Sequence, residues 1–199
     1  MLDKEVLGAI SVLLVVIAYI PYYRSLFKGT TKPHIFSWVI FGSCHAVGFI
    51  GPYLRGAGAG SWSSAITSVN CFVIAALAFS RGEKSITKSD WVSFILALFI
   101  IPVWYLTKDP LGAVLLALLI FSLGIYPTAR KSVVDPYSEN IFTWAVGSVR
   151  YLISFLAVEH YLIVTSVFQL GTFFMNTIVV ILLVWCRYKQ SKPISVRKS

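Results

Sequence analysis

Long apolar runs separated by short polar segments dominate the chain as far as about residue 186. Seven of them approach the ~20 residues that an α-helix needs to cross a bilayer. They cover approximately residues 6–27, 34–53, 61–80, 91–106, 111–126, 141–158 and 161–186. Helices are expected rather than strands, because open strands would leave backbone groups unpaired in lipid. The pattern predicts an all-α membrane protein with seven transmembrane helices.

Composition agrees with the bilayer as the main solvent. Hydrophobic residues make up 57% of the sequence and charged residues only 13%. The connections are short, so we expect a single transmembrane domain, residues 1–199, with any functional site among the helices. The opening MLDKE precedes no small-residue cleavage site, so the first run is expected to remain a helix.

The net charge of +9 is explained by topology. The loops after the first, third and fifth runs and the tail, residues 187–199, together hold 13 of the 17 Lys and Arg residues. By the positive-inside rule these segments are cytoplasmic and the amino terminus is outside. No nucleic-acid partner is expected. The expected partners are lipid and a small-molecule substrate, and a homo-oligomer is possible. The short loops favour a prokaryotic plasma membrane.

An internal repeat relates the two ends of the chain through a gap-free shift of 106 residues. The shift pairs Pro21 with Pro127, Arg24 with Arg130, Trp38 with Trp144 and Asn70 with Asn176. Repeat one covers about 6–80, repeat two covers about 111–186, and a linker helix at about 91–106 joins them. Three helices and the linker helix make an even number of membrane crossings, so both repeats enter the membrane from the same side. This predicts parallel repeats in a 3+1+3 plan.

With this plan, its proline and asparagine pairs and its basic loops, the chain resembles the PQ-loop or MtN3 superfamily over about residues 6–187. That superfamily includes the SWEET sugar facilitators and the PnuC vitamin transporters. The resemblance implies a membrane transporter whose asparagines, here Asn70 and Asn176, face a central cavity and contact substrate. This chain has Pro21-Tyr22 and Pro127-Thr128 where the family often has Pro-Gln. It also lacks an obvious tryptophan below each asparagine, so sugar specificity is not implied.

Pro21 and Pro127 are candidate hinges. A proline inside a transmembrane helix removes one backbone hydrogen bond and bends the helix. Two bends at equivalent positions suit a gate, although static bends that fit two helices into a bundle remain the alternative.

Polar side chains at mid-depth are the candidate substrate ligands, because such groups are costly in lipid and usually face a cavity. They are His45, Asn70, Arg150 and Asn176, with Tyr151, the repeat mate of His45, and Gln169 ranked second. For the asparagines, hydrogen bonding between helices is the competing interpretation.

Arg150 is the strongest single candidate among these residues. It lies on a stripe with Thr143, Gly147 and Ser154 at helical spacing, which should face protein or water. No Asp or Glu is expected near mid-depth, so a substrate anion would complement the guanidinium. The alternative is an arginine bonded to backbone carbonyls or reaching toward an interface.

No catalytic constellation, metal-ligand spacing or nucleotide-binding loop is evident, so neither an enzyme nor a cofactor or metal is expected. GAGAG, residues 56–60, is interpreted as a short outside loop. The sequence therefore predicts a transporter of a small polar or anionic metabolite that works by alternating access, with uniport favoured. The alternatives are a non-transporting receptor or sorting protein of the KDEL-receptor type and a structural membrane subunit.

Overall fold

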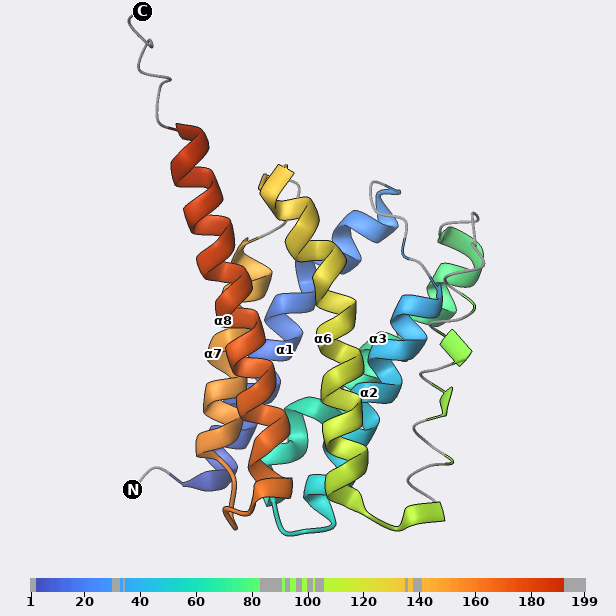
Figure 1. Ribbon diagram of the computed structural model, residues 1–199, viewed down its shortest axis with the longest axis vertical. Helices are drawn as coiled ribbons and strands as arrows, with labels where there is room; N and C mark the ends of the chain where they lie inside the picture. Colours follow the sequence, from blue (N-terminus) through green and yellow to red (C-terminus); the bar gives the residue numbers. More distant parts are fainter. Residues whose placement is uncertain are drawn as a thin grey trace, which may run out of the picture.

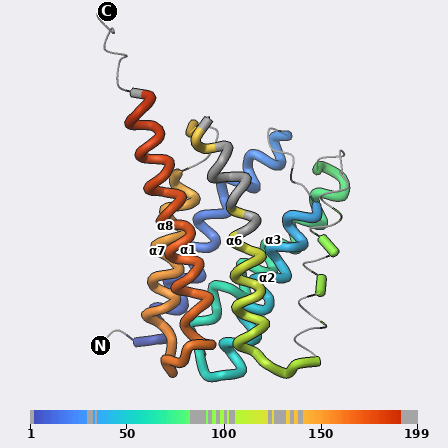
Figure 2. The backbone as a smooth tube through the Cα atoms, viewed as in Figure 1, coloured from blue at the N-terminus to red at the C-terminus, as the bar shows by residue number. Residues whose placement is uncertain are grey.

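The computed structural model describes residues 3–29, 33, 35–82, 91, 94, 95, 98, 99, 102, 106–134, 136, 137 and 141–191, without the side chains of 123, 124, 126–131, 134 and 191. Within these residues it has six α-helices and one 3-10 turn, and no strand (Figures 1 and 2). They are α1 (Lys4–Phe27), α2 (Ile35–Tyr53), η1 (Gly58–Ser61), α3 (Trp62–Arg81), α6 (Pro110–Val134), α7 (Ile141–Leu156) and α8 (Ile163–Ser191). The all-helical prediction is confirmed. The predicted linker helix at 91–106 lies largely outside the described residues.

Several helices are long and apolar enough to cross a bilayer. They are α1, α2, the continuous helical stretch Gly58–Arg81, and α8 from Ile163 to Gln190. Shorter apolar helical stretches cover Pro110–Ser122 and Ile141–Leu156. The protein is therefore an integral membrane protein.

The side chains are distributed inside out relative to a water-soluble bundle. Large apolar residues of α1 and α8 are exposed, including Leu13, Val16, Phe174 and Ile178. Hydroxyl, amide, imidazole and guanidinium groups are buried instead. This arrangement suits a lipid solvent, where polar groups must find partners inside the protein.

Two aspartates begin two of the helices in the same way. Asp3 accepts a hydrogen bond from the backbone N–H of Glu5 at 3.0 Å, and Asp109 accepts one from Leu111 at 3.0 Å. Each carboxylate satisfies a backbone donor that the first turn of a helix leaves free. In α6 the helix then continues to Val134, past the predicted end at residue 126. Hydropathy marks the apolar part of a helix, whereas backbone hydrogen bonding continues into the polar segment beyond it.

The helices contact one another in equivalent pairs. α1 packs against α7 as α6 packs against α2, and α2 pairs with α3 as α7 pairs with α8. α1 also contacts α3, and α6 contacts α8. Figure 1 shows the start of α1, η1, the start of α6 and the α7–α8 connection at one end of the bundle, which we call the η1 end. The ends of α1, α3, α6 and α8 lie at the opposite end.

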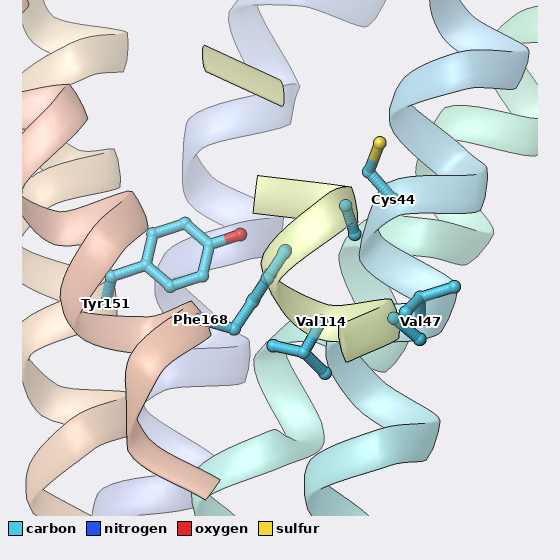
Figure 3. Packing of buried hydrophobic residues seen from close by; sticks show 7 residues of the cluster. Cys44, Val47, Val114, Tyr151 and Phe168 are labelled. Atoms are coloured by element: carbon cyan, nitrogen blue, oxygen red, sulfur yellow. The ribbon is translucent and has the colours of Figure 1, made fainter. Parts of the chain in front are cut away.

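A compact apolar cluster lies where α2, α6, α7 and α8 meet (Figure 3). Its buried members are Cys44, Val47, Ala113, Val114, Ala117, Tyr151 and Phe168. Their packing holds α2 and α7 each against α8, which places the polar residues of α2 and α7 beside the same core.

Candidate functional site

The stripe of α7 that was predicted to face protein or water is largely buried. Gly147, Arg150 and Ser154 are all buried, as expected for one face of a helix packed inside a bundle. Thr143, near the start of α7 and one turn before Gly147, is exposed.

Arg150 is held between α7 and α3. Its side chain is 7% exposed, and its Nη1 donates a hydrogen bond to Thr67 Oγ1 at 2.7 Å. Its Cζ lies 4.1 Å from the ring centroid of Tyr151. Thr67 in turn donates to the carbonyl of Ser63, one turn earlier in α3. The guanidinium therefore has neutral partners that fix its position.

No carboxylate balances this charge in the part of the chain that the structure describes. The described acidic residues are Asp3, Glu5, Asp109 and Glu159, and all of them are exposed. The groups within electrostatic reach of Arg150 include Tyr19, His45 and Cys71, which are not anions at neutral pH. Among the described residues, hydroxyl and aromatic groups rather than a carboxylate therefore contact the guanidinium.

His45 and Tyr151 meet at the centre of the bundle. Nδ1 of His45 and the hydroxyl of Tyr151 share a hydrogen bond of 3.0 Å, and the two rings are stacked with centroids 6.1 Å apart. His45 is 3% exposed and Tyr151 is fully buried. Phe121 and Phe168 pack edge-on against the imidazole. The two residues are separated by 106 positions, the same shift that relates the two ends of the sequence.

Asn70 and Asn176 occupy equivalent places in α3 and α8 but have different neighbours. The amide nitrogen of each donates to a carbonyl four residues earlier, that of Ile66 at 2.9 Å and that of Thr172 at 2.7 Å. Asn70 Oδ1 also accepts from the hydroxyl of Tyr23 at 3.0 Å, whereas Asn176 Oδ1 packs against Gly147.

The predicted site residues thus form one central group and two flanking positions. His45, Arg150 and Tyr151 are brought together. Each asparagine is anchored on its own helix, and no hydrogen bond to Arg150 or His45 is found for either in the described residues. Pro21 lies inside α1, less than two turns before its end. Pro127 lies inside α6, but its side chain is outside the described residues, and the hinge prediction remains a prediction for both.

Sequence reasoning missed the hydroxyl groups of α3. Ser63 and Thr67 are fully buried, and the hydroxyl of Ser63 hydrogen-bonds with that of Ser154 in α7. The signal was present in SSAITSVN, residues 63–70, where polar residues recur every three or four positions. Isolated hydroxyl groups are common in membrane helices, so Ser63 and Thr67 are a weaker signal in the sequence than an arginine or an asparagine.

A groove of about 440 Å³ lies between α1, α2 and α3. It is lined by Val12, Phe49, Tyr53, Trp62, Ala65 and Ile66. This apolar lining suits a lipid chain better than a polar substrate.

The three cysteines are buried and free, and the described residues contain no cluster of His, Cys, Asp or Glu that could hold a metal ion.

Comparison of the chain with protein-family models, with curated proteins and with solved structures finds no match.

Proposed function

We propose that the protein is a seven-helix membrane transporter that moves a small polar metabolite, with an anionic group held by Arg150. Two three-helix repeats joined by a linker helix alternate access to a site between them, in the manner of the PQ-loop and MtN3 transporters that the sequence resembles. Facilitated diffusion is favoured over coupling to protons, since the structure describes no carboxylate at mid-depth that could serve as a proton relay.

The repeat is supported by several independent features of the bundle. Helix contacts occur in equivalent pairs, and the capping aspartates Asp3 and Asp109 are related by the shift of 106 residues. Asn70 and Asn176 repeat the same bond to their own helices. In a two-fold arrangement, equivalent residues touch each other only near the axis. The contact between His45 and Tyr151 therefore favours an axis that passes through this pair.

The observation that carries the function is the buried Arg150 with no described carboxylate beside it. Removing a guanidinium from water costs several kcal/mol unless an opposite charge compensates. One of its five N–H donors bonds to Thr67 Oγ1, and the guanidinium otherwise lies over the ring of Tyr151. A carboxylate or phosphate would satisfy the remaining donors in two-point contact.

The η1 end is assigned to the outside of the membrane. Basic residues gather at the opposite end, namely Arg24, Lys28, Arg81, Arg187 and Lys189, against Lys4, Arg55 and Lys108 at the η1 end. The positive-inside rule then places the opposite end in the cytoplasm. A single cysteine at Arg55 should label with an impermeant reagent only from outside, and one at Lys189 only from inside. The reverse pattern would overturn this orientation.

Reconstitution into liposomes tests the function itself. Uptake would be measured with a panel of small carboxylates, phosphates, nucleosides and sugars, each against empty liposomes. We expect flux for at least one anionic compound and its loss in Arg150→Gln. Binding of an anion without any flux would instead favour the receptor function, for which a buried arginine is equally suitable. Flux of neutral compounds alone, unchanged in Arg150→Gln, would contradict the anion site.

A further inference from the structure

The segment GAGAG, residues 56–60, is packed far more tightly than a connecting loop needs to be. Ala57 and Ala59 are fully buried. Gly56 and Gly58 have positive φ angles of 83° and 52°, a conformation that favours glycine. The segment therefore has a defined shape at the η1 end, where it leads through η1 into α3.

This segment is fastened to the turn between α7 and α8, residues 157–160. The backbone N–H of Glu159 donates to the carbonyl of Ala57, and that of His160 donates to the carbonyl of Gly56. The carboxylate of Glu159 accepts from the N–H of Ala59 at 3.4 Å. Three hydrogen bonds thus link a loop of the first three helices to a loop of the last three.

Glycine at position 60 is what permits this close approach. A Cβ at Gly60 would lie 2.7 Å from the Cα of Val158 and 2.8 Å from the carbonyl oxygen of Ser154. Both contacts are with backbone, which cannot move aside as a flexible side chain would. Any side chain at position 60 must therefore push the segment away from the end of α7.

Unsatisfied polar groups lie directly behind this contact. Gln169 is fully buried and donates from Nε2 to the carbonyl of Gly60 at 3.2 Å, while its Oε1 has no hydrogen-bond partner among the described residues. Ser64, one turn after Gly60, is also fully buried, and its hydroxyl has no hydrogen-bond partner in the part of the chain that the structure describes. Buried polar atoms without partners are uncommon, because each costs free energy that water or a polar ligand would recover.

A line of hydrogen-bonding groups continues from there to the arginine. Ser63 is bonded to Ser154, and Thr67, one turn further along α3, accepts from Arg150. Polar side chains of α3, α7 and α8 therefore follow one another from segment 56–60 to Arg150 in the middle of the bundle.

We propose that segment 56–60, seated on residues 157–160, is the gate at the η1 end of the transport path. Ser64 and Gln169 are the first groups that a polar substrate and its water meet when this gate opens. The proposal rests on the proposed function, because the path it closes leads to Arg150. The structure describes this gate in its closed state.

The first test measures access to Ser64 in purified protein. Ser64→Cys would be reacted with a charged, water-soluble maleimide, with the wild type, whose three cysteines are buried, as background. Adding Gly60→Ala should raise the labelling rate about tenfold or more by shifting the population toward the open gate. Gly29→Ala is the control for a general loss of stability, because alanine strains the backbone there, at a positive φ, but nothing lies within 4 Å of the Cβ position.

An unchanged rate in Gly60→Ala would overturn the gate, as would an equal rise in Gly29→Ala. If Gly60→Ala does not fold, Glu159→Ala replaces it and removes only the carboxylate that accepts from Ala59. We then expect a rise of about threefold in the labelling rate, since one hydrogen bond contributes roughly this much to an equilibrium. No rise there would also overturn the proposal.

The second test locks the gate. A Cβ at Gly56 would lie 3.6 Å from the Cβ of His160, within the spacing of about 3.5–4.5 Å found in disulfides. Oxidised Gly56→Cys/His160→Cys should lose most of its flux in liposomes and regain it after reduction, while Gly56→Cys alone should not respond. Full flux through the cross-linked protein would contradict the gate. If the wild type carries no flux, the proposed function fails, and the labelling test still decides the gate.

Discussion

The two three-helix segments, α1 to α3 and α6 to α8, have the same contact pattern but different chemistry at the centre. α2 contributes Cys44 and His45, and 106 positions later α7 contributes Arg150 and Tyr151. Cys44 is fully buried in the apolar cluster, whereas Arg150 is bonded to Thr67 across the interface with α3. The two segments therefore share an arrangement of helices, but of these two equivalent positions only the one in α7 carries a charge. The candidate site is asymmetric for this reason.

The largest effect that this asymmetry predicts is on anion binding. Arg150→Gln should abolish stabilisation by an anionic ligand, with a loss of about 2–5 kcal/mol in binding free energy. Arg150→Lys should weaken it partly, because lysine keeps the charge but not the two-point geometry. The measurement is thermal stabilisation of the purified protein by the ligand panel, with the wild type and both variants side by side. A wild type that responds only to neutral or cationic compounds, with the same response in Arg150→Gln, would make Arg150 structural.

A second effect concerns stability without ligand, where the equivalent positions 44 and 150 should respond in opposite directions. Arg150→Met replaces a buried charge by an apolar chain of similar length and should raise the free energy of unfolding by about 1–4 kcal/mol. Cys44→Ala should lower it by roughly 1 kcal/mol, because it leaves a small void in the apolar cluster.

Denaturant unfolding in one detergent would compare the two variants with the wild type. A loss of stability in Arg150→Met would mean that the charge of the guanidinium is already compensated within the protein. Positions 44 and 150 would then not respond in opposite directions, and the proposed difference between the two segments would be wrong.

The contact between His45 and Tyr151 should give a smaller, coupled effect. A double-mutant cycle with His45→Phe and Tyr151→Phe isolates their hydrogen bond, and we expect a coupling free energy of about 0.5–1.5 kcal/mol. Phe121→Leu and Tyr151→Phe form a control cycle, since Phe121 touches His45 through its ring. Coupling no larger than in the control cycle would show that the hydrogen bond does not join the two segments.

The smallest predicted difference is between the two asparagines. Asn70→Leu leaves the hydroxyl of Tyr23 without this partner, whereas Asn176→Leu removes only a bond to its own helix. We expect Asn70→Leu to be less stable than Asn176→Leu by roughly 0.6 kcal/mol, the usual size of a side-chain hydrogen bond between membrane helices. Both should lose ligand binding at nearly wild-type folded yield. Retained binding together with a large loss of stability in both variants would identify the asparagines as contacts between helices.

Hydropathy was enough to predict the helical class and the approximate positions of the six described helices. The polarity of their side chains and the 106-residue shift also singled out His45, Arg150 and Tyr151, which the structure brings together. These features depend on side-chain polarity, which the sequence displays directly. The bond from Arg150 to Thr67 could not be predicted, because it depends on which face α3 turns toward α7. The role of GAGAG was missed for a similar reason, since the closeness of Gly60 to Val158 follows from tertiary packing rather than from local composition.

The length of α7 has a consequence for the bilayer around the protein. α7 has 16 residues, which corresponds to about 24 Å of helix, whereas α8 beside it has 29 residues, or about 43 Å. A typical hydrocarbon core is about 30 Å thick, so the membrane should thin locally beside α7 while α8 reaches beyond it. Arg150 is borne by this short helix, only six residues from its end at Leu156. In bilayers of longer acyl chains the membrane would have to thin further beside α7, and the free energy of holding a charge there would rise. The surrounding lipid thickness is thus expected to tune how readily the arginine accepts an anion.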